Sequence, residues 1–431
     1  MTVHRLTRLR TPAVAAGLAL AATAGLVATA YAAAPHNEQV VLVNETNAQA
    51  DAKSMINGTA QVSSADGRFV VFSTAASLVP QDTNDLDDVY LRDTGDGITI
   101  LVSAKGTRPG NDYSIEPTIS GDGRWVAFTT YATNLFKDRN GSTLDVVVKD
   151  MQTGRIRLVS ADTDGRQYRR NSFFPVISGN GHRVAFQTFA PFGRLDGDKR
   201  EDVYVHDIAK GWTRQASLTA RGHDISRSLA DGDISDDGRL VTFGNDTDLW
   251  VRNLATGQTT RFWHEPAQAP CSGLPAGSAG RPVISGNGKY VAFSTCSTRM
   301  PGADGEFVQV YRMRLSDRSV RLVSQTGHGP ANDHSYLPSL STTGRYVGFG
   351  SDATDLAPDT SVDPDAFVAD LATGTITRAS QSPDGDESNN WSASTAAAIS
   401  GDGQTLVYES YATNLVADDQ YDWEEVFVWR S

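Results

Sequence analysis

The sequence lacks the short motifs that mark common catalytic centres. It contains no Gly-x-Ser-x-Gly elbow between a strand and a helix, no Walker phosphate loop, no Cys-x-x-Cys pair and no His-Glu-x-x-His metal site. No local pattern therefore predicts a serine hydrolase, a P-loop nucleotide hydrolase or a zinc peptidase. We assign no residue a catalytic role from the sequence.

Long apolar runs are missing too, except at the start of the chain. There, three arginines precede an Ala/Leu/Val stretch over residues 13–30, which small residues follow. This order is typical of a secretory signal peptide. We predict a signal peptide over residues 1–34, cleaved after Ala32 or Ala34, and one domain over residues 35–431. An uncleaved membrane anchor is the alternative. We expect the mature protein to be secreted or held in the cell envelope, without a membrane span.

Basic residues are fewer than acidic ones. The chain has 38 Lys and Arg against 51 Asp and Glu, a net charge of −13. Residues 1–34 hold three Arg and no acid, so the mature chain has 35 − 51 = −16. Such a surface repels nucleic acid and anionic lipid. We expect a monomer that binds no nucleic acid.

Cysteine is scarce as well: Cys271 and Cys296 are the only two. An even pair in an exported protein favours a disulfide over two free thiols. Closing this loop would stabilise the fold by about 3 kcal/mol in the chain-entropy model. We predict a structural bridge.

Glycine is abundant, and much of it belongs to one repeated motif. Seven copies of a pattern such as ISGDGRWVAF recur at spacings of 50–59 residues: Ser63–Phe72, Ile119–Phe128, Ile177–Phe186, Ile234–Phe243, Ile284–Phe293, Leu340–Phe349 and Ile399–Tyr408. The Gly-Asp-Gly segment is typical of a tight hairpin turn. Two further short apolar runs complete each unit, which predicts a four-stranded antiparallel meander. These runs are nearly continuous rather than alternating, so both faces of each sheet must be covered.

Stacking such units around an axis makes a β-propeller. The last unit stops after its third run, residues 425–430, while residues 39–44 match the fourth runs of other units. We therefore predict an all-β fold, a seven-bladed β-propeller in which an N-terminal strand closes the last blade and removes an open edge. Six blades is the runner-up.

The segments SGDGRWVAF, TNL, DVYLRD and ILVS resemble the TolB-like propeller repeat, a relative of the WD repeat. The resemblance spans residues 39–431 and implies a β-propeller. It implies little about activity, because such propellers include partner-binding periplasmic proteins, domains of peptidases and some lyases.

A loop rich in acidic residues follows the second strand of five units. Oxygen-bearing side chains at alternating positions suit a hard cation such as Ca²⁺. The candidate ligands are Asp82, Asn84, Asp88, Asp138, Asn140, Asp145, Asp196, Asp198, Asp202, Asp359, Asp363, Asp365, Asp418, Asp422 and Glu424. The alternative is that these side chains cap their own loops and the last acid anchors the third strand. The loops are expected on the rim that also carries the crossovers between blades.

Units four and five depart from the pattern. Their acidic loops are short, a long crossover spans residues 265–281, and the region holds both cysteines and the aromatic pair Phe262 and Trp263. This indicates either a special side of the ring or drift in a surface loop pinned by the disulfide.

Two functions lead, and a structural or cell-envelope scaffold with no dedicated ligand is the remaining alternative. The first is a secreted, non-catalytic propeller that binds a protein or glycan through the acidic loop face, with structural calcium. The second is a metal-assisted polysaccharide lyase or hydrolase acting at the channel mouth. His223, His328 and His334 fall on that rim, but their spacing specifies no metal site. The Ser-x-Asp-x-Gly turn resembles the Asp-box of sialidases, yet Asn or Thr replaces the Asp in three copies, as expected for turn chemistry.

Overall fold

The computed structural model describes residues 36–39, 53–56, 61–192, 200–225, 230–245, 247–264, 281–303, 305–358, 361–417, 419 and 423–431. These residues belong to one compact unit, Ala34–Ser431. All their regular elements are strands, and none of them lies in a helix of the length and hydropathy needed to span a membrane. The predicted signal peptide lies outside the described residues.

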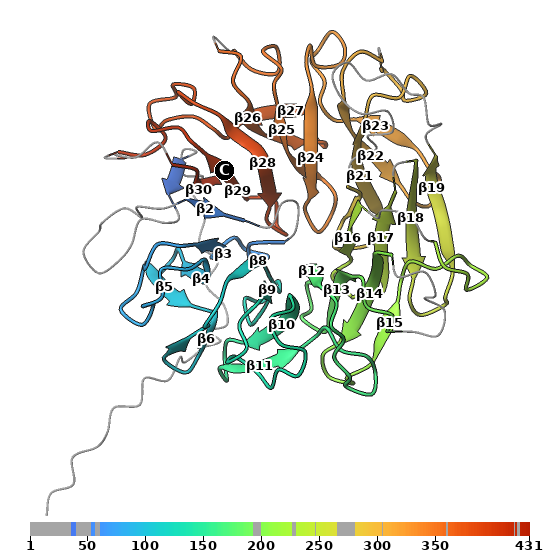
Figure 1. Ribbon diagram of the computed structural model, residues 1–431. Coiled ribbons are helices and arrows are strands. Elements are labelled where there is room, and N and C mark those ends of the chain that lie inside the picture. Colours follow the sequence, from blue (N-terminus) through green and yellow to red (C-terminus); the bar gives the residue numbers. More distant parts are fainter. Residues whose placement is uncertain are drawn as a thin grey trace, which may run out of the picture. The chain divides into compact units, whose positions relative to one another are not determined.

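Seven antiparallel four-stranded sheets, the blades, succeed one another along the chain (Figure 1). Blades 1 to 4 are β2 (Ser54–Met55), β3 (Phe69–Thr74), β4 (Asp88–Asp93) and β5 (Ile98–Leu101); β8 (Ser114–Ile119), β9 (Trp125–Thr130), β10 (Asp145–Asp150) and β11 (Arg155–Leu158); β12 (Ser172–Ile177), β13 (Arg183–Thr188), β14 (Asp202–Asp207) and β15 (Thr213–Gln215); and β16 (Ala230–Ile234), β17 (Leu240–Gly244), β18 (Asp248–Asn253) and β19 (Thr259–His264).

Blades 5 to 7 are β20 (Val283–Ile284), β21 (Tyr290–Thr295), β22 (Gln309–Arg314) and β23 (Val320–Leu322); β24 (Ser335–Leu340), β25 (Tyr346–Ser351), β26 (Asp365–Asp370) and β27 (Thr375–Arg378); and β28 (Ser392–Ile399), β29 (Thr405–Ser410), β30 (Glu425–Arg430) and β1 (His36–Gln39). A small hairpin of β6 (Ala104–Lys105) and β7 (Arg108–Pro109) sits in the first crossover. The prediction of a seven-bladed all-β propeller is confirmed, and the six-bladed alternative is wrong.

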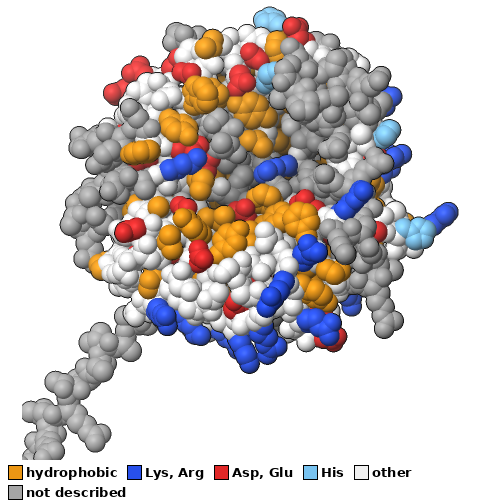
Figure 2. Space-filling model, viewed as in Figure 1, with side chains coloured by type: hydrophobic (Ala, Val, Ile, Leu, Met, Phe, Trp, Pro, Cys, Tyr) orange, Lys and Arg blue, Asp and Glu red, His pale blue; other side chains and the backbone are white. Residues whose placement is uncertain are grey.

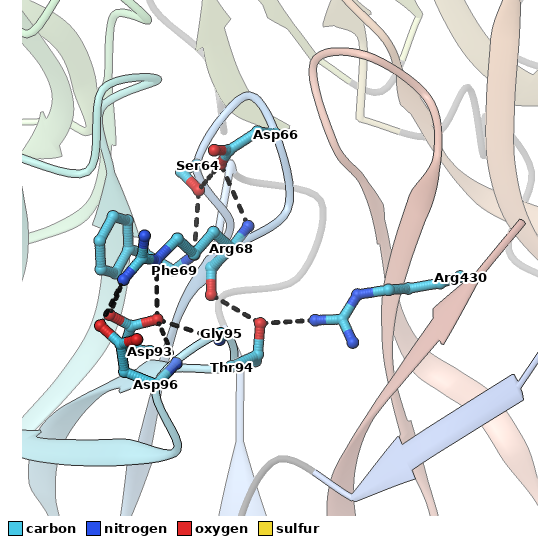
Figure 3. A network of polar contacts seen from close by, with 9 residues as sticks. All are labelled: Ser64, Asp66, Arg68, Phe69, Asp93, Thr94, Gly95, Asp96 and Arg430. Atoms are coloured by element: carbon cyan, nitrogen blue, oxygen red, sulfur yellow. Dashed lines mark hydrogen bonds and ion pairs between the residues drawn. The ribbon is translucent and has the colours of Figure 1, made fainter. Parts of the chain in front are cut away.

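The repeated motif forms the hairpin between the first and second strands of a blade. In blade 2 the Asp122 carboxylate accepts hydrogen bonds from Ser120 Oγ at 2.5 Å and from the Arg124 amide at 3.0 Å. Gly123 adopts φ +71°, which glycine accepts without strain. Ser64, Asp66 and Arg68 repeat the arrangement in blade 1 (Figure 3). The acid of the motif is therefore a turn-forming residue.

The same glycine lets neighbouring blades approach one another. A methyl group added at Gly181 would lie 2.5 Å from Trp125 of the preceding blade, and one at Gly344 would lie 2.7 Å from Tyr290. Both distances are far inside van der Waals contact. The aromatic residue that opens the second strand of one blade thus packs against the turn of the next.

A closed chain of backbone hydrogen bonds joins all seven hairpins. Each bond runs from an amide of one blade to a carbonyl of the next and measures 2.8–2.9 Å: Ala65 to Gly121, Gly121 to Gly179, Asn180 to Asp236, Asp236 to Gly286, Asn287 to Thr342, Thr342 to Gly401, and Asp402 to Ala65. The last bond returns to blade 1. From β8 to β28, the first strands contact each other in sequence around the centre (Figure 1).

The N-terminal segment completes blade 7. β1 pairs antiparallel with β30, with His36 opposite Arg430 and Gln39 opposite Phe427. The predicted closure is confirmed, but the described strand covers residues 36–39 where the sequence predicted 39–44. Residues 40–44 lie outside the described residues.

Strand order divides the ends of the blades between two faces. The turn face carries the hairpins between first and second strands and between third and fourth strands. The loop face carries the loops between second and third strands and the crossovers between blades. This is the arrangement predicted for the acidic loops.

Removing β1 should weaken the whole ring. A chain that begins at residue 40 loses the four residue pairs with β30, each backbone bond contributing about 0.5–1 kcal/mol net, and exposes a strand edge. We expect the free energy of unfolding to fall by roughly 2–4 kcal/mol, measured by denaturant unfolding. A chain that begins at residue 35 is the control. Equal stability of the two chains would contradict closure by β1.

Candidate functional site

The central channel is narrowed at the turn face by one side chain. A methyl group added at Gly179 or Gly286 would lie 2.4 Å or 2.0 Å from the Asp236 carboxylate. Asp236 reaches across the ring and accepts a hydrogen bond from Thr342 Oγ1 at 2.9 Å. Only a cavity of about 40 Å³ remains beside it, room for water but not for a ligand. The turn-face end of the channel is therefore narrow at Asp236.

A second carboxylate lies deeper in the channel wall. Asp233, on β16, accepts the amides of Ile234 and of Ile284 in the next blade, both at 2.7 Å. Burial raises its pKa to about 7. Both carboxylate oxygens thus accept hydrogen bonds from backbone amides. Asp233 therefore links two blades, and neither oxygen is without a hydrogen-bond donor.

Nearer the loop face, the first strands of several blades are bulged. Glu116, Phe174 and Leu337 occupy equivalent positions in blades 2, 3 and 6 and have φ between +48° and +55°. Left-handed conformations at non-glycine residues are strained and concentrate at functional sites. Bulges of this kind re-aim side chains. All three residues lie on the first strands of their blades.

These bulges make contacts between blades. Glu116 Oε2 accepts the Phe174 amide at 2.9 Å and Thr129 Oγ1 at 2.7 Å. The Arg281 guanidinium of blade 5 lies 5.7 Å from the centroid of the Phe174 ring in blade 3. A cation from one blade therefore stands over an aromatic ring two blades away, at a distance typical of a cation–π contact.

Exposed apolar side chains gather on the loop face. Among the described residues, the exposed large hydrophobic side chains are Ile98, Tyr113, Phe189, Val362, Trp391 and Trp423, and all but Ile98 lie in loop-face segments. Tyr113 and Trp391 are 45% and 53% exposed, and each directly precedes the first residue of an innermost strand. Figure 2 shows hydrophobic side chains around the centre of the face in view, with acidic and basic side chains among them.

The acidic loops are built differently from the predicted ligand sets. In blade 2, Ser160 Oγ donates to Asp145 Oδ1 at 2.7 Å and accepts the Val146 amide at 3.1 Å. Asn140 also donates to Asp145, at 3.3 Å. The last acid of the loop thus holds the start of the third strand to the end of the fourth through a serine.

Three other blades repeat this contact, which we call the Asp–Ser clasp. Its members are Asp88 with Ser103, Asp202 with Ser217, and Asp365 with Ser380. Blade 5 uses Gln309 Oε1 with Ser324 Oγ, at 2.6 Å. A neutral amide therefore serves as well as an acid, which points to hydrogen bonding rather than charge as the requirement. These contacts match the alternative to metal binding, in which the last acid of each loop anchors the third strand. The final Ser of the ILVS and RLVS segments was the sequence signal for this contact.

Most of the described candidate ligands are buried. Asp82, Asp88, Asn140, Asp145, Asp202, Asp365 and Glu424 are at most 6% exposed, whereas Asn84, Asp138 and Asp363 are partly exposed. Asp196, Asp198, Asp359, Asp418 and Asp422 lie outside the described residues. Within the described part of the chain, no group of three or more His, Cys, Asp or Glu side chains is placed to hold a metal ion. Calcium at the remaining loop positions stays a prediction.

The histidines near the loop face are not gathered either. His334 Nδ1 accepts the Val308 amide at 3.0 Å, which leaves one ring nitrogen, while His223 and His328 lie in separate crossovers. Cys296 is buried, and no described cysteine is a free thiol. Its predicted partner Cys271 lies outside the described residues, so the bridge stays a prediction.

No protein-family model and no curated protein matches the chain. Solved structures do. An oligogalacturonate lyase in complex with manganese is 13% identical, with 88% of this chain and 90% of that chain covered and a TM-score of 0.55. The β-propeller domain of the Trilobed protease from Pyrococcus furiosus, described as having an open velcro topology, is 10% identical over 89% and 94% of the chains, with a TM-score of 0.53.

TolB from Acinetobacter baumannii is 14% identical over 85% and 81% of the chains, with a TM-score of 0.41. At these identities the likeness concerns the fold alone. The β-propeller expected from the sequence agrees with the propeller domain that matches at a TM-score of 0.53.

Loss of one clasp serine should destabilise the protein. Ser160→Ala leaves the buried Asp145 carboxylate and the Val146 amide each short of a partner, which should lower the free energy of unfolding by about 2–3 kcal/mol. Ser142→Ala, at an exposed position of the same blade, should change it by less than about 0.5 kcal/mol. Similar thermal midpoints for both variants would contradict the clasp.

Stability should fall as pH rises above about 5. Burial raises the pKa of Asp145 to about 6, of Asp202 to about 7 and of Glu409 to about 8. Between the unfolded-state and folded-state pKa values the folded protein holds protons that the unfolded chain has released. The free energy of unfolding therefore declines through this range.

Denaturant unfolding at pH 5 and pH 8 measures this decline. Glu409→Gln keeps the Oε1 acceptor for the Ile56 amide and should shrink the difference between the two pH values. Asp164→Asn, an exposed charge control, should not. A protein more stable at pH 8 than at pH 5 would contradict the assignment.

Proposed function

We propose that the protein acts by binding rather than by catalysis, and that its contact surface is the loop face around the channel mouth. The observation that carries the proposal is the placement of exposed apolar side chains: five of the six among the described residues lie in loop-face segments. The contact is aromatic more than acidic, since the clasp carboxylates of the acidic loops are buried. This revises the acidic contact surface expected from the sequence.

A glycan is the partner that we favour. Tyr113 and Trp391 present flat apolar rings beside amide side chains, Asn111 and Asn389, which bond to the neighbouring loops. Concave sites that combine aromatic faces with a few fixed polar groups suit ring-shaped polar ligands. A structural neighbour is named as an oligogalacturonate lyase, so a propeller of this kind can work on an acidic oligosaccharide. Arg281, over Phe174, offers a cation for such a ligand.

Export and oligomeric state belong to the same proposal. The predicted signal peptide over residues 1–34 would deliver the protein to the secreted or cell-envelope space where glycans are found. We propose that it works there as a monomer, because one copy already carries the whole channel mouth.

A metal-assisted lyase at the same mouth is the second candidate. The neighbour that holds manganese favours it. The described residues do not offer a converged ligand set, so we derive no catalytic step. His328 and His334 are the first residues to replace if an oligogalacturonate incubated with Mn²⁺ yields an unsaturated product.

Glycan binding is tested by titrating the purified protein with oligogalacturonates and with neutral cello-oligosaccharides, followed by calorimetry. We expect saturable binding in at least one series. Trp391→Ala and Tyr113→Ala should each weaken it about tenfold, because truncating an aromatic anchor removes 1–2 kcal/mol or more. Ile98→Ala truncates the exposed large hydrophobic side chain of the turn face and should leave glycan binding unchanged.

The alternatives give different results. No saturable binding in either series, or equal binding by the wild type and both aromatic variants, would reject a glycan site at the mouth. Product formation that depends on Mn²⁺ and is lost in His334→Ala would replace binding by catalysis.

A further inference from the structure

The hairpins of the turn face carry a repeated ion pair. The basic residue that follows the hairpin turn pairs with the Asp that ends the third strand of the same blade. The pairs are Arg68 with Asp93 at 2.7 Å, Arg124 with Asp150 at 2.9 Å and Arg345 with Asp370 at 2.6 Å. Figure 3 shows the first of them. In blade 3 His182 follows the turn, and Arg183, one residue later, lies 3.5 Å from Asp207. Blades 1, 2, 3 and 6 therefore cancel the charge of each turn locally.

In blade 5 a basic residue takes the place of the acidic partner of this pair. Lys289 holds the basic position, but β22 ends in Arg314, which stands opposite Tyr290 just as Asp93 stands opposite Phe69 in blade 1. The Lys289 ammonium has no ion-pair or hydrogen-bond partner within the described part of the chain. Blade 4 loses the acid as well, since β18 ends in Asn253.

Arg318 adds a third positive charge beside Lys289 and Arg314. Among the described residues Asp317 is the carboxylate partner of Arg314, at 3.4 Å, and both side chains are about half exposed, so the pair is weak. Arg318 donates to the Arg261 carbonyl of blade 4 at 3.4 Å. Like charges left close together repel unless an anion lies between them. On a chain with net charge −13, this group is a local exception.

The three cations border a cleft between blades 4 and 5. It has a volume of about 840 Å³ and its apolar lining includes Leu240, Val251, Phe262, Tyr290 and Leu315. None of the lining residues is acidic. The cleft therefore combines apolar lining side chains with positively charged side chains at its border.

The cleft has a cause in the sequence. The residue that packs against the turn glycine of the next blade is aromatic in several blades, for example Trp125 against Gly181 and Tyr290 against Gly344. Blade 4 places the smaller Leu240 there, against Gly288. Its third strand β18 is then mostly half-exposed, whereas the equivalent β10 of blade 2 is buried throughout. The missing aromatic volume leaves the space open.

We propose that this cleft binds a small amphipathic anion, an organic molecule with an apolar body and a carboxylate, sulfonate or phosphate group. The apolar body would lie on Leu240, Phe262 and Tyr290, and the anionic group would bridge Lys289 and Arg314. The volume falls within the range of small-molecule sites. The cleft is on the turn face, so it is independent of the glycan site proposed for the loop face.

Binding is measured with 1-anilinonaphthalene-8-sulfonate, a fluorescent probe that has both parts. We expect saturable binding to one site on the cooperatively folded protein, weaker at high salt. Decanoate should displace the probe and the neutral decanol should not. This comparison separates recognition of charge from apolar contact alone.

Two variants test the two halves of the site. Arg314→Asp introduces the acid that blades 1, 2, 3 and 6 have at this position, so it should weaken probe binding at least tenfold without loss of thermal stability. Leu240→Trp restores the bulk found at Trp125 and should weaken binding to a similar degree without a change of charge. Arg139→Asp, an exposed loop-face residue, makes the same charge change elsewhere and should leave binding unaltered.

The proposal is overturned by absence of saturable probe binding, by unaltered binding in both Arg314→Asp and Leu240→Trp, or by displacement with decanol as effective as with decanoate. If Arg314→Asp does not fold, Lys289→Gln takes its place with the same expected loss. Glycan titrations at the loop face should be unaffected by either cleft variant, so the two sites succeed or fail separately.

Discussion

The structure depends on the contact between one hairpin and the next. Each blade has two apolar faces and cannot bury both alone, so its stability requires a neighbour on either side. Seven backbone bonds of 2.8–2.9 Å link the hairpins into a closed circle, and the pairing of β1 with β30 holds first and last blades together. The circle also narrows the channel, because Asp236 fills its turn-face end.

Because the hairpins hold the ring, the loops and outer strands are free to differ. Five blades keep a side-chain oxygen at the start of the third strand and a serine at the end of the fourth, and Gln309 shows that the oxygen need not be charged. Most of the polar side chains of these loops are therefore buried and bond within the protein. The large apolar side chains exposed on the loop face include Tyr113 and Trp391, each of which directly precedes the first strand of a blade.

Blades 4 and 5 show how a repeat acquires an individual feature. Leu240 lies where blades 1, 2, 5 and 6 have an aromatic side chain, and Arg314 lies where blades 1, 2, 3 and 6 have an acid. Neither change disturbs the hairpin circle, since Asp236 and Asn287 keep their backbone bonds to the next blades. The departure that the sequence shows in this region therefore coincides with a cleft on the turn face.

The sequence by itself determined the fold. Repeat spacing, Gly-Asp-Gly turns and the split last unit are local patterns with one physical solution, a closed ring. Tertiary structure alone decided the site. Spacing could not tell metal ligands from clasps, because Asp145 meets a serine 15 residues away on another strand. Arg281 meets Phe174 only because the ring brings blades 3 and 5 to one channel. Burial and charge pairing between distant residues are properties of packing, which no single stretch of the chain encodes.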